Sequence, residues 1–456
     1  MQQDVIAIFD IGKTNKKILL FDKQLRLVFQ EEQKIEEIMD EDGFSCDDLP
    51  LVEAWILEEI RQLSLSKDYS LKAVNFATYG ATLIYLDKDG HRLTPAYNYL
   101  KPMPEDVLDG FYQKYGGIEE FSRNTASPAL GMLNSGLQIL WLKKHKPEVF
   151  SQVSSILHLP QYFYFLVNKQ ITSELTSVGC HTAMWDFDKN CYHAWLADEK
   201  IELPVPVIND ESTELIVNDQ KIQVGIGIHD SSSSLVPYLK GSSEPFILIS
   251  TGTWCIFMNP FNDEPLTAEQ LSKDSLCYIS TRQKQVKSSR LFMGHIHDVN
   301  SQRIADHYGI NSDYYKSVVP NESVVNKRFH NRMFFKDGIC AGYIDSSVDL
   351  SVFSSPEEAY HQLVIDITYL AMDSLQLVIP ENDNTTSVYV TGGFARNVIF
   401  LRLLATRLPG KTIYTSEVDN ATAFGAAITL WNKSFTGTEP ILDLGLKEIE
   451  AFKIIQ

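Results

Sequence analysis

Four short segments carry the residues best suited to chemistry, and each joins small or hydroxyl residues to at most one carboxylate. The segments are Asp10-Ile-Gly-Lys-Thr-Asn15, Gly227-Ile-His-Asp230, Ser250-Thr-Gly-Thr253 and Thr391-Gly-Gly-Phe-Ala-Arg-Asn397. Backbone N–H groups in such turns, together with threonine hydroxyls, can bind phosphate oxygens. The carboxylates Asp10 and Asp230 are the candidates for holding a metal ion and for accepting a proton.

These residue types suit phosphoryl transfer, which needs phosphate cradles, a divalent metal ion and a residue that orients the attacking hydroxyl. Asp10 can hold Mg²⁺ directly or through water, because Mg²⁺ prefers oxygen ligands and keeps several waters. Asp230 can accept the proton of a substrate hydroxyl. A carboxylate with a pKa of about 4 is a weak base at pH 7, so orientation of the hydroxyl is its larger contribution.

Taken singly, each segment also has an ordinary structural explanation. Asp10 can be a turn residue, Asp230 can cap a helix, and Gly252 and Gly392-Gly393 can be simple turn glycines. All of these explanations would have to coincide in this chain order. The combination therefore favours a shared functional role.

Two of the segments close hairpins that resemble each other. Residues 5–20 (VIAIFDIGKTNKKILL) and 246–258 (FILISTGTWCIFM) are both an apolar run, a glycine-containing turn and a second apolar run. When Gly12 and Gly252 are aligned, Asp10 falls opposite Ser250, so only the first copy has the carboxylate. The duplication predicts two related lobes with one metal-side carboxylate between them.

The other elements predicted from hydrophobic periodicity alternate between strands and helices. Strands are expected at 25–31, 72–79, 82–87, 92–99, 223–228, 387–391 and 412–415, and helices at 49–65, 104–115, 135–146, 159–168, 356–378, 395–407 and 420–433. The runs 82–87 and 92–99 are expected to pair as a hairpin. This mixture predicts an α/β architecture with lobes 1–242 and 243–456.

Composition narrows the class of protein. The chain has 456 residues, 44% hydrophobic content and a formal net charge of -19, which argues against nucleic acid as the main partner. Six scattered cysteines have no CxxC spacing, and His295-x-His297-Asp298 lacks a third metal ligand. The cysteines are expected to be free thiols, and we expect a cytoplasmic protein without a signal peptide or membrane-spanning run.

Together these motifs resemble the FGGY family of carbohydrate kinases, in the actin/hexokinase-like ATPase superfamily, over residues 4–433. The stretch from Asp10 to Lys17 is similar to the first phosphate motif D-x-G-A-T-N-x-R of fuculokinases, and His229-Asp230 to their H-D-T-A-S-A segment. Ser250-Thr-Gly-Thr-Trp254 is similar to S-G-T-W of the same enzymes. Gly392-Gly393 with Asn397 resembles the adenosine motif G-G-G-x-x-N, and Ala77-Thr-Tyr-Gly80 lies where rhamnulokinases have T-W-G.

The resemblance implies two ribonuclease-H-like lobes with mixed sheets, a cleft between them, Mg²⁺ held by Asp10, and Asp230 as the catalytic base. The residues implied to contact ATP are Gly12, Lys13, Thr14, Asn15, Lys17, Gly252, Thr253, Gly392, Gly393 and Asn397. The residues implied to contact the sugar are Tyr79, Gly80, His229, Asp230 and Ser231.

The identity of the sugar follows from the branch of the family and stays open. The His229-Asp230 and Gly252-Thr-Trp254 pair favours a deoxy-ketose, rhamnulose or fuculose, phosphorylated on its terminal hydroxyl. The family pattern is broken by Lys13 for a small residue, Lys17 for Arg, Tyr97-Asn-Tyr99 for Y-R-D, Gly294-His-Ile for G-L-W and Phe394 for the third glycine. Kinases of xylulose or glycerol and a catalytically weak sugar- or nucleotide-responsive regulator remain alternatives, and a homodimer is left open.

Overall fold

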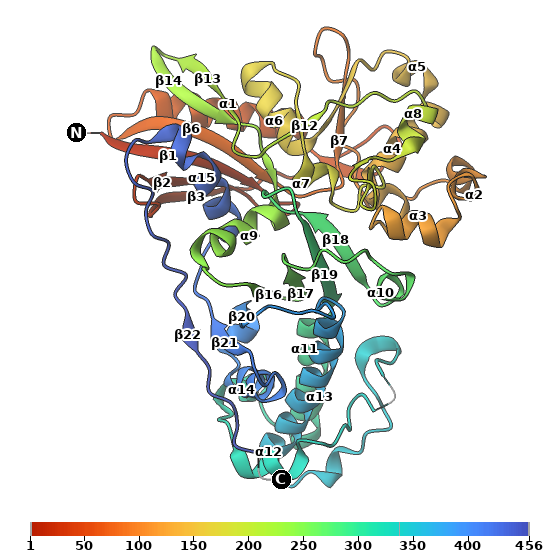
Figure 1. The fold of residues 1–456 in the computed structure, drawn as a ribbon, viewed down its shortest axis with the longest axis vertical. Helices are drawn as coiled ribbons and strands as arrows, with labels where there is room; N and C mark the ends of the chain where they lie inside the picture. Colours follow the sequence, from red (N-terminus) through yellow and green to blue (C-terminus); the bar gives the residue numbers. More distant parts are fainter. Residues whose placement is uncertain (1, 337, 455–456) are drawn as a thin grey trace.

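The computed structural model describes residues 2–336 and 338–454, which form two lobes, each built around a seven-stranded sheet (Figure 1). The N-terminal lobe lies at the top of Figure 1 and most of the C-terminal half of the chain lies below it. Helix α9 (Asp230–Gly241) lies at the junction of the two. The predicted α/β class with two sheet-centred lobes is confirmed.

The N-terminal sheet is centred on β1 (Gln3–Ile11). Strand β2 lies between β1 and β3 and is antiparallel to both, and β6 and β14 continue the sheet in parallel on the other side of β1. The bounds are β2 (Lys16–Asp22), β3 (Leu27–Gln33), β6 (Tyr69–Thr78), β13 (Ser212–Val217), β14 (Gln220–Gly225) and β15 (Ile228–His229), where β13 is the outer edge and β15 pairs with the end of β6.

The C-terminal sheet repeats this order of strands. Its three antiparallel strands are β16 (Phe246–Thr251), β17 (Cys255–Asn259) and β19 (Gln285–Leu291), followed in parallel by β20 (Ser387–Gly392) and β21 (Thr412–Thr415). Strands β18 (Ser275–Ile279) and β22 (Lys447–Glu448) extend its two edges. The hairpin duplication seen in the sequence is therefore the start of a duplicated sheet topology.

Helices cover both faces of the N-terminal sheet. On one face lie α6 (Leu159–Asn168) and α1 (Leu49–Ser64), which begins at the capping Asp48 side chain and buries Val52 and Ile56 at helical spacing. On the other face lies α15 (Ala421–Ser434), whose alanines pack against Ile6 and Ile8 of β1. Small side chains let this helix approach the sheet closely.

Helix α15 also crosses α9 closely. A Cβ atom on Gly425 would collide with the backbone carbonyl oxygen of Ser233, so only glycine fits this crossing. The chain thus leaves the C-terminal sheet after β21, returns to the N-terminal sheet as α15, and descends again to β22 (Figure 1). Residues 421–434, which lie in the second half of a linear division at 242, are packed on the first lobe.

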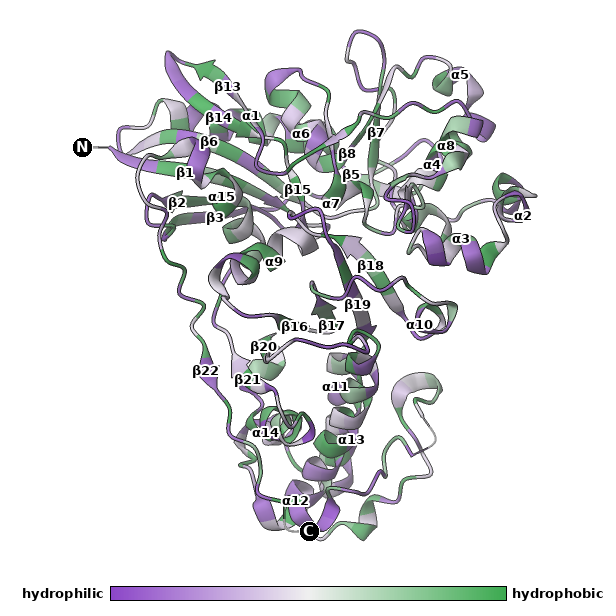
Figure 2. Cartoon of the chain, in the orientation of Figure 1, coloured by the Kyte–Doolittle hydropathy of each residue, from purple (hydrophilic) through white to green (hydrophobic). Residues whose placement is uncertain are grey.

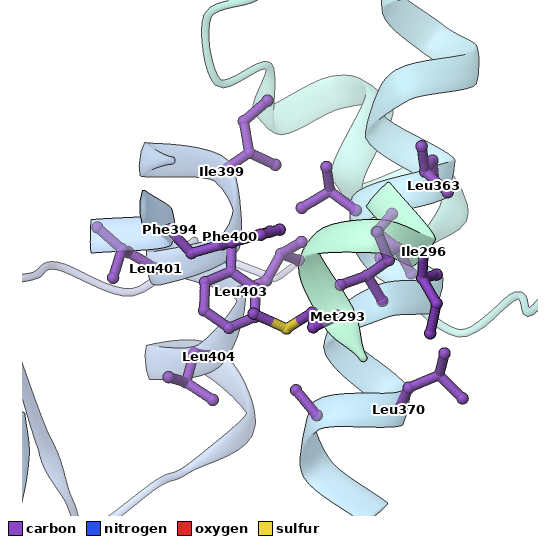
Figure 3. Packing of buried hydrophobic residues seen from close by; sticks show 14 of the residues in the cluster. Met293, Ile296, Leu363, Leu370, Phe394, Ile399, Phe400, Leu401, Leu403 and Leu404 are labelled. Carbon is purple, nitrogen blue, oxygen red and sulfur yellow. The ribbon is translucent and has the colours of Figure 1, made fainter. Parts of the chain in front are cut away.

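The C-terminal lobe is held by packing of three helices. Met293 and Ile296 of α11 (Met293–Tyr308) face Leu363 of α13 (Pro356–Gln376) and Leu403 of α14 (Val398–Arg407) in one apolar cluster (Figure 3). Figure 2 shows the same segregation in colour, because the central strands carry mainly hydrophobic residues and the outer helix α12 (Glu322–Arg328) is largely hydrophilic.

Two predictions in the N-terminal lobe need correction. The hairpin expected from 82–87 and 92–99 exists only next to its turn, where Arg92 bridges Leu86 and the Leu93 N–H donates to the Tyr85 carbonyl at 2.9 Å. Residues 92–99 form no continuous strand, and the ladder of β7 (Leu83–Leu86) is with β8 (Ser155–His158). The segment turns toward the hairpin of β4 (Glu37–Met39) and β5 (Ser45–Asp47), because the Asn98 amide donates to the Ser45 carbonyl. The helix expected at 104–115 is two short turns, η1 (Glu105–Leu108) and α2 (Phe111–Lys114), separated at Gly110, which has φ of 70°.

Several elements lay outside the sequence predictions, among them β18, β19 and α11. The α-helices not yet named are α3 (Ile118–Asn124), α4 (Ser135–His145), which was predicted, α5 (Pro147–Phe150), α7 (Leu175–Val178), α8 (Ala194–Asp198) and α10 (Ala268–Ser272). The strands not yet named are β9 (Ser173–Glu174), β10 (Trp185–Asp186), β11 (Cys191–Tyr192) and β12 (Pro206–Val207). Within the described residues, none of the helices has the length and apolar character needed to span a membrane.

Candidate active site

The turn of the first hairpin presents a short exposed loop between β1 and β2. The Gly12 N–H donates to the Asn15 carbonyl at 2.9 Å, which closes the loop and leaves Thr14 and Asn15 exposed. Asp10 and Lys17 are partners across the hairpin. The turn therefore offers exposed backbone and hydroxyl groups next to one carboxylate and one ammonium group.

The turn of the second hairpin is closed in the same way, since the Gly252 N–H donates to the Trp254 carbonyl at 3.0 Å. Gly252 and Thr253 are exposed. The Gly294 N–H at the start of α11 donates to the Thr253 carbonyl at 3.1 Å, and a Cβ atom on Gly294 would collide with the Gly252 carbonyl. Gly294 thus lets α11 begin directly against this turn.

A cavity of 680 Å³ opens beside the second hairpin and contains all the C-terminal residues predicted to contact ATP except Gly392. Its lining includes Gly252, Thr253, Gly294, His297, Tyr315, Tyr360, Gly393, Phe394 and Asn397. Gly392 precedes the lining residue Gly393 in the chain. Its φ is 84°, and a Cβ atom there would collide with the Thr251 carbonyl, so this position needs glycine. The cavity has the size and the mixed polar and aromatic lining of a site for a small ligand.

Polar side chains at the inner end of this cavity are linked to one another. The Asn397 amide donates to the Tyr360 hydroxyl at 2.9 Å, and its oxygen caps α14 by accepting from the Phe400 N–H. The His297 Nε2 atom lies 3.0 Å from the same hydroxyl, and burial lowers the pKa of His297. Phe394, which replaces the third glycine of the motif, is buried against His297 and Phe400.

The two candidate carboxylates lie close enough to interact. Burial, followed by the negative charge of Asp230, raises the pKa of Asp10 to about 6, although Lys17 opposes this shift. Asp230 is the first residue of α9, where the helix dipole favours a negative charge, and its Oδ1 accepts from the Ser231 N–H. The Asp10 carboxylate, with its pKa raised in the absence of a cation, supplies the oxygen ligand that a divalent cation such as Mg²⁺ prefers.

Gly80 and His229 are brought together by the pairing of β15 with the end of β6. A Cβ atom on Gly80 would lie 3.0 Å from His229 Nε2, so glycine keeps the space beside the imidazole open. The Nε2 atom is 3.2 Å from Asp230 Oδ1. Burial disfavours the charged imidazole, yet the negative groups of Cys180 and Asp230 outweigh it and raise the pKa of His229 to about 9.

Lys13 has a role that the sequence did not indicate. Its ammonium group forms ion pairs with Glu37 and, at 2.9 Å, with Asp47, so it faces neither open solvent nor a lone phosphate cradle. Asp47 also accepts from Lys16 at 2.8 Å and from the Tyr79 hydroxyl. The predicted sugar-side residue Tyr79 and the predicted phosphate-loop residue Lys13 are thus joined through one buried carboxylate.

The structure brings some of the predicted residues together. Gly252, Thr253, Gly393 and Asn397 line one cavity, and Gly80, His229 and Asp230 lie together near Asp10. It also adds residues that the sequence did not single out. Asp47 is one, and Cys180 and His181, which line a second cavity of 220 Å³ with His229 and Ser231, are others. No local pattern marks them, because they reach the site through contacts distant in sequence. The sequence also gave no indication that residues 315–320 line the 680 Å³ cavity beside the second hairpin.

The duplicated sheets, each beginning with a glycine-turn hairpin, define the actin-like ATPase fold. A carbohydrate kinase from Novosphingobium aromaticivorans shares it with a TM-score of 0.79 at 22% identity, covering 99% of this chain and 95% of that one. Xylulose kinase from Lactobacillus acidophilus gives a TM-score of 0.73 at 19% identity, with 98% and 92% covered.

The sequence comparisons give the family. The N-terminal domain of the FGGY family of carbohydrate kinases matches residues 5–228, and the FGGY C-terminal domain matches residues 243–438. A rhamnulokinase from Halalkalibacterium halodurans is 22% identical over 92% of both chains. A rhamnulokinase from Yersinia pestis is 24% identical over 58% of this chain and 56% of its own length. The protein belongs to the FGGY family of carbohydrate kinases and is a sugar kinase.

Proposed function

We propose that the protein transfers the γ-phosphoryl group of ATP to the terminal hydroxyl of a ketose, with Asp230 as the acceptor of the hydroxyl proton. The observation that carries this proposal is that Asp10 of the first hairpin lies near enough to Asp230, at the start of α9, for the charge of Asp230 to raise the pKa of Asp10. A candidate metal carboxylate then lies near a candidate base. The cavity beside Gly252 and Gly393 supports a nucleotide on the C-terminal side of that contact.

Each group of residues then has a distinct task. The turns at Gly12 and Gly252 bind phosphate oxygens, and Asn397 holds the Tyr360 side of the nucleotide cavity in place. Asp10 holds Mg²⁺, which when bound neutralises phosphate charge. Asp230 orients the sugar hydroxyl and takes its proton, while His229 fixes the position of the carboxylate. Closure of the lobes excludes water that would compete for the phosphoryl group.

The expected sugar is a deoxy-ketose such as rhamnulose or fuculose. The His229-Asp230 pair, Trp254 after the second turn and the similarity to rhamnulokinases support this choice. Similarity of fold to a xylulose kinase keeps xylulose as the second candidate, with glycerol as a third. Release of ADP with Mg-ATP should be measured across a panel of ketoses and polyols, and the highest kcat/KM identifies the substrate.

The same panel decides between an enzyme and a regulator built on the same scaffold. A regulator should bind ATP in calorimetry and release no ADP with any sugar. Flat responses across the panel would contradict the kinase proposal for this chain.

Substitution of Asp230 tests the proposed base. We expect Asp230→Asn to keep the shape of the site and to lower kcat by about 10²-fold or more, the usual scale for loss of a general base. Asp210→Asn changes an exposed carboxylate in the turn before β13 and is the matched control. Turnover by the Asp230 variant within a few-fold of the control would exclude Asp230 from this role.

Two further expectations stay proposals. We infer a division into a lobe of residues 1–242 and a lobe of residues 243–456, in which α15 of the second lobe packs on the sheet of the first. We also place the protein in the cytoplasm, because it uses ATP and its six cysteines are free thiols, as expected of a reducing compartment.

A further inference from the structure

The thiol of Cys180 lies immediately behind the proposed base. Its Sγ atom is 3.4 Å from His229 Nε2, and the same nitrogen is 3.2 Å from Asp230 Oδ1. One ring nitrogen of His229 therefore lies within hydrogen-bond distance of both the Cys180 sulfur and the Asp230 carboxylate, which is to accept the substrate proton. Cys180 is 6% exposed, in contrast to the exposed Cys191.

The surroundings of this thiol leave room for a small reagent. Cys180, His181 and His229 line the cavity of 220 Å³ together with Ser231 and Ser250. The Nδ1 atoms of His181 and of His229, which is 4% exposed, have no hydrogen-bond partner among the described residues. Buried ring nitrogens without a partner are uncommon, and they occur where side chains have a redox or catalytic role.

The backbone around the cavity is held in an uncommon conformation. His181, next to Cys180 in the chain, has φ of 41°, and Ala183 has φ of 62°. Residues other than glycine with such φ values are strained and persist where the surrounding structure imposes them. Strain in the segment that carries Cys180 indicates that the fold fixes the position of this thiol.

The charges around Cys180 favour its thiolate. Burial alone would raise the pKa of the thiol, but His181 and His229 outweigh burial and lower the pKa to about 6. Other ionisable groups face the pair from neighbouring elements. They are His158 of β8, Glu174 of β9, Asp230 of α9, and Asp274, Tyr278 and Arg290 at the cavity wall. Burial, followed by the charge of His229, lowers the pKa of His158 to about 3, so His158 adds no positive charge at neutral pH.

We propose that Cys180 is a reactive thiol, paired with His229 and His181, at which small oxidants and electrophiles switch the kinase off. The proposal rests on the proposed function, because the switch acts through Asp230. With hydrogen peroxide, the thiolate sulfur attacks one peroxide oxygen. An S–O bond forms as the O–O bond breaks, sulfur loses two electrons to become a sulfenic acid, and the leaving hydroxide takes a proton from the imidazolium and departs as water.

The reaction disables the site in two ways. The added oxygen occupies the cavity beside His229, and the imidazole becomes neutral, so its positive charge no longer holds the Asp230 carboxylate. Because a sulfenic acid is reduced by thiols, activity returns with dithiothreitol. The same thiol reacts irreversibly with iodoacetamide, which gives a probe that needs no turnover.

The first experiment measures the rate of iodoacetamide labelling of each cysteine in the full chain between about pH 5 and 9, with mass spectrometry as the readout. Cys180 should reach its maximal rate near neutral pH, where an unperturbed thiol with a pKa of about 8.5 is still gaining rate. The exposed Cys191 is the comparison within the same chain. His229→Gln and His181→Gln should each move the Cys180 profile to higher pH, and His91→Gln, in an exposed turn, should not. A Cys180 profile parallel to that of Cys191, or no labelling of Cys180, overturns the proposal.

The second experiment follows kinase activity during peroxide treatment. Wild type should lose activity with trapping of the Cys180 sulfenic acid by dimedone, and Cys191→Ser should behave like wild type. Cys180→Ser, compared with its own untreated activity, should resist peroxide. Equal loss in Cys180→Ser overturns the switch. Labelling is read without turnover, so a protein that phosphorylates no sugar but labels at Cys180 refutes the proposed function and leaves the reactive thiol intact.

Discussion

Asp10 shows that one side chain is placed for function at a cost in stability. Burial of its carboxylate and the negative charge of Asp230 together raise its pKa to about 6, against the opposing effect of Lys17. In the metal-free protein the charged form is therefore less favourable than in the unfolded chain. A divalent cation at this position would reverse the balance, because it favours the charged carboxylate.

Replacing Asp10 by asparagine should therefore stabilise the metal-free protein and abolish Mg²⁺-dependent activity. The folded pKa is raised, so the cost of the charge is absent below the unfolded pKa and is fully present above about pH 6. We expect a gain of roughly 2 kcal/mol in the free energy of unfolding at pH 7.5 and a smaller gain at pH 5. Urea unfolding at both pH values measures this.

Asp4→Asn is the control for that experiment, since Asp4 lies at the exposed start of the same strand. It should change the free energy of unfolding little at either pH. An Asp10 variant that keeps activity at ordinary Mg²⁺ concentrations would show that Asp10 is only a turn residue.

Asp47 holds the lysines of the first phosphate turn in place. It is buried and accepts from Lys13, Lys16 and the Tyr79 hydroxyl, so its loss leaves two ammonium groups without their shared partner. We expect Asp47→Ala to lower the free energy of unfolding by about 3 kcal/mol, in the range for removing one partner of a buried pair. Chemical denaturation at pH 7 measures the loss.

The neighbouring Asp48→Ala is the matched control, because it removes only the cap of α1 and should cost about 1 kcal/mol. Hydrogen bonds and ion pairs outweigh burial and lower the pKa of Asp47. Its stabilising contribution is therefore present above the unfolded pKa of about 4 and is lost as pH falls through the lower folded value. Equal losses in the two variants would argue against the network.

Single residues also mark the limit of what the sequence could predict about the site. Asp10, Asp230 and the turn glycines belong to local patterns and were predicted from them. Asp47 meets Lys13 across 34 positions and Cys180 meets His229 across 49, and no spacing rule relates such pairs. The orientation of Lys13 could therefore not be predicted, because it is set by the contact with Asp47.

At the scale of elements, the hairpins were predictable because a glycine turn sets the pairing of the strands that flank it. Alternation alone identifies a strand without naming its partner. The expected pairing of β7 with 92–99 therefore holds only at Arg92 and Leu93, and the ladder of β7 is with β8. Pro95 supplies no N–H to a ladder, and Asn98 bonds to the β4–β5 hairpin. Tertiary contacts decided this pairing.

The crossing of α9 and α15 gives a prediction at the same scale. Gly425→Ala places a methyl group where the Ser233 carbonyl lies, so the two helices must separate. Overpacking of this kind costs about 1–3 kcal/mol, against a helix-propensity gain of about 1 kcal/mol for alanine. Because α9 begins with Asp230, we also expect kcat to fall several-fold.

Thermal unfolding and steady-state kinetics of Gly425→Ala measure both effects. Asn432→Ala, an exposed position on the same helix, is the control and should stay within about 0.5 kcal/mol of wild type. A stabilised and fully active Gly425 variant would show that the crossing tolerates a side chain and does not position α9.

The chain passes between the two lobes more than once, and these crossings hold the whole molecule together. After β21 the chain returns to the N-terminal sheet as α15 and then pairs β22 with the C-terminal sheet. Phe452 near the end packs against Arg402 of α14. Periodicity in the sequence identified α15 as a helix, but its small-residue face gave no indication of which sheet it would cover.

The N-terminal residues should therefore be unable to fold without α15. Residues 1–242 alone would expose the face of β1, β2 and β6 that includes Ile6, Ile8 and Phe21, which α15 buries in the intact chain. We expect that fragment to bind hydrophobic dyes and to unfold without a cooperative transition. Fusing residues 416–436 to its end through a flexible linker should restore cooperative unfolding, while an equally long fusion of 356–376 should not. Cooperative unfolding of the 1–242 fragment by itself would mean that the lobe is independent and that α15 is only docked on it.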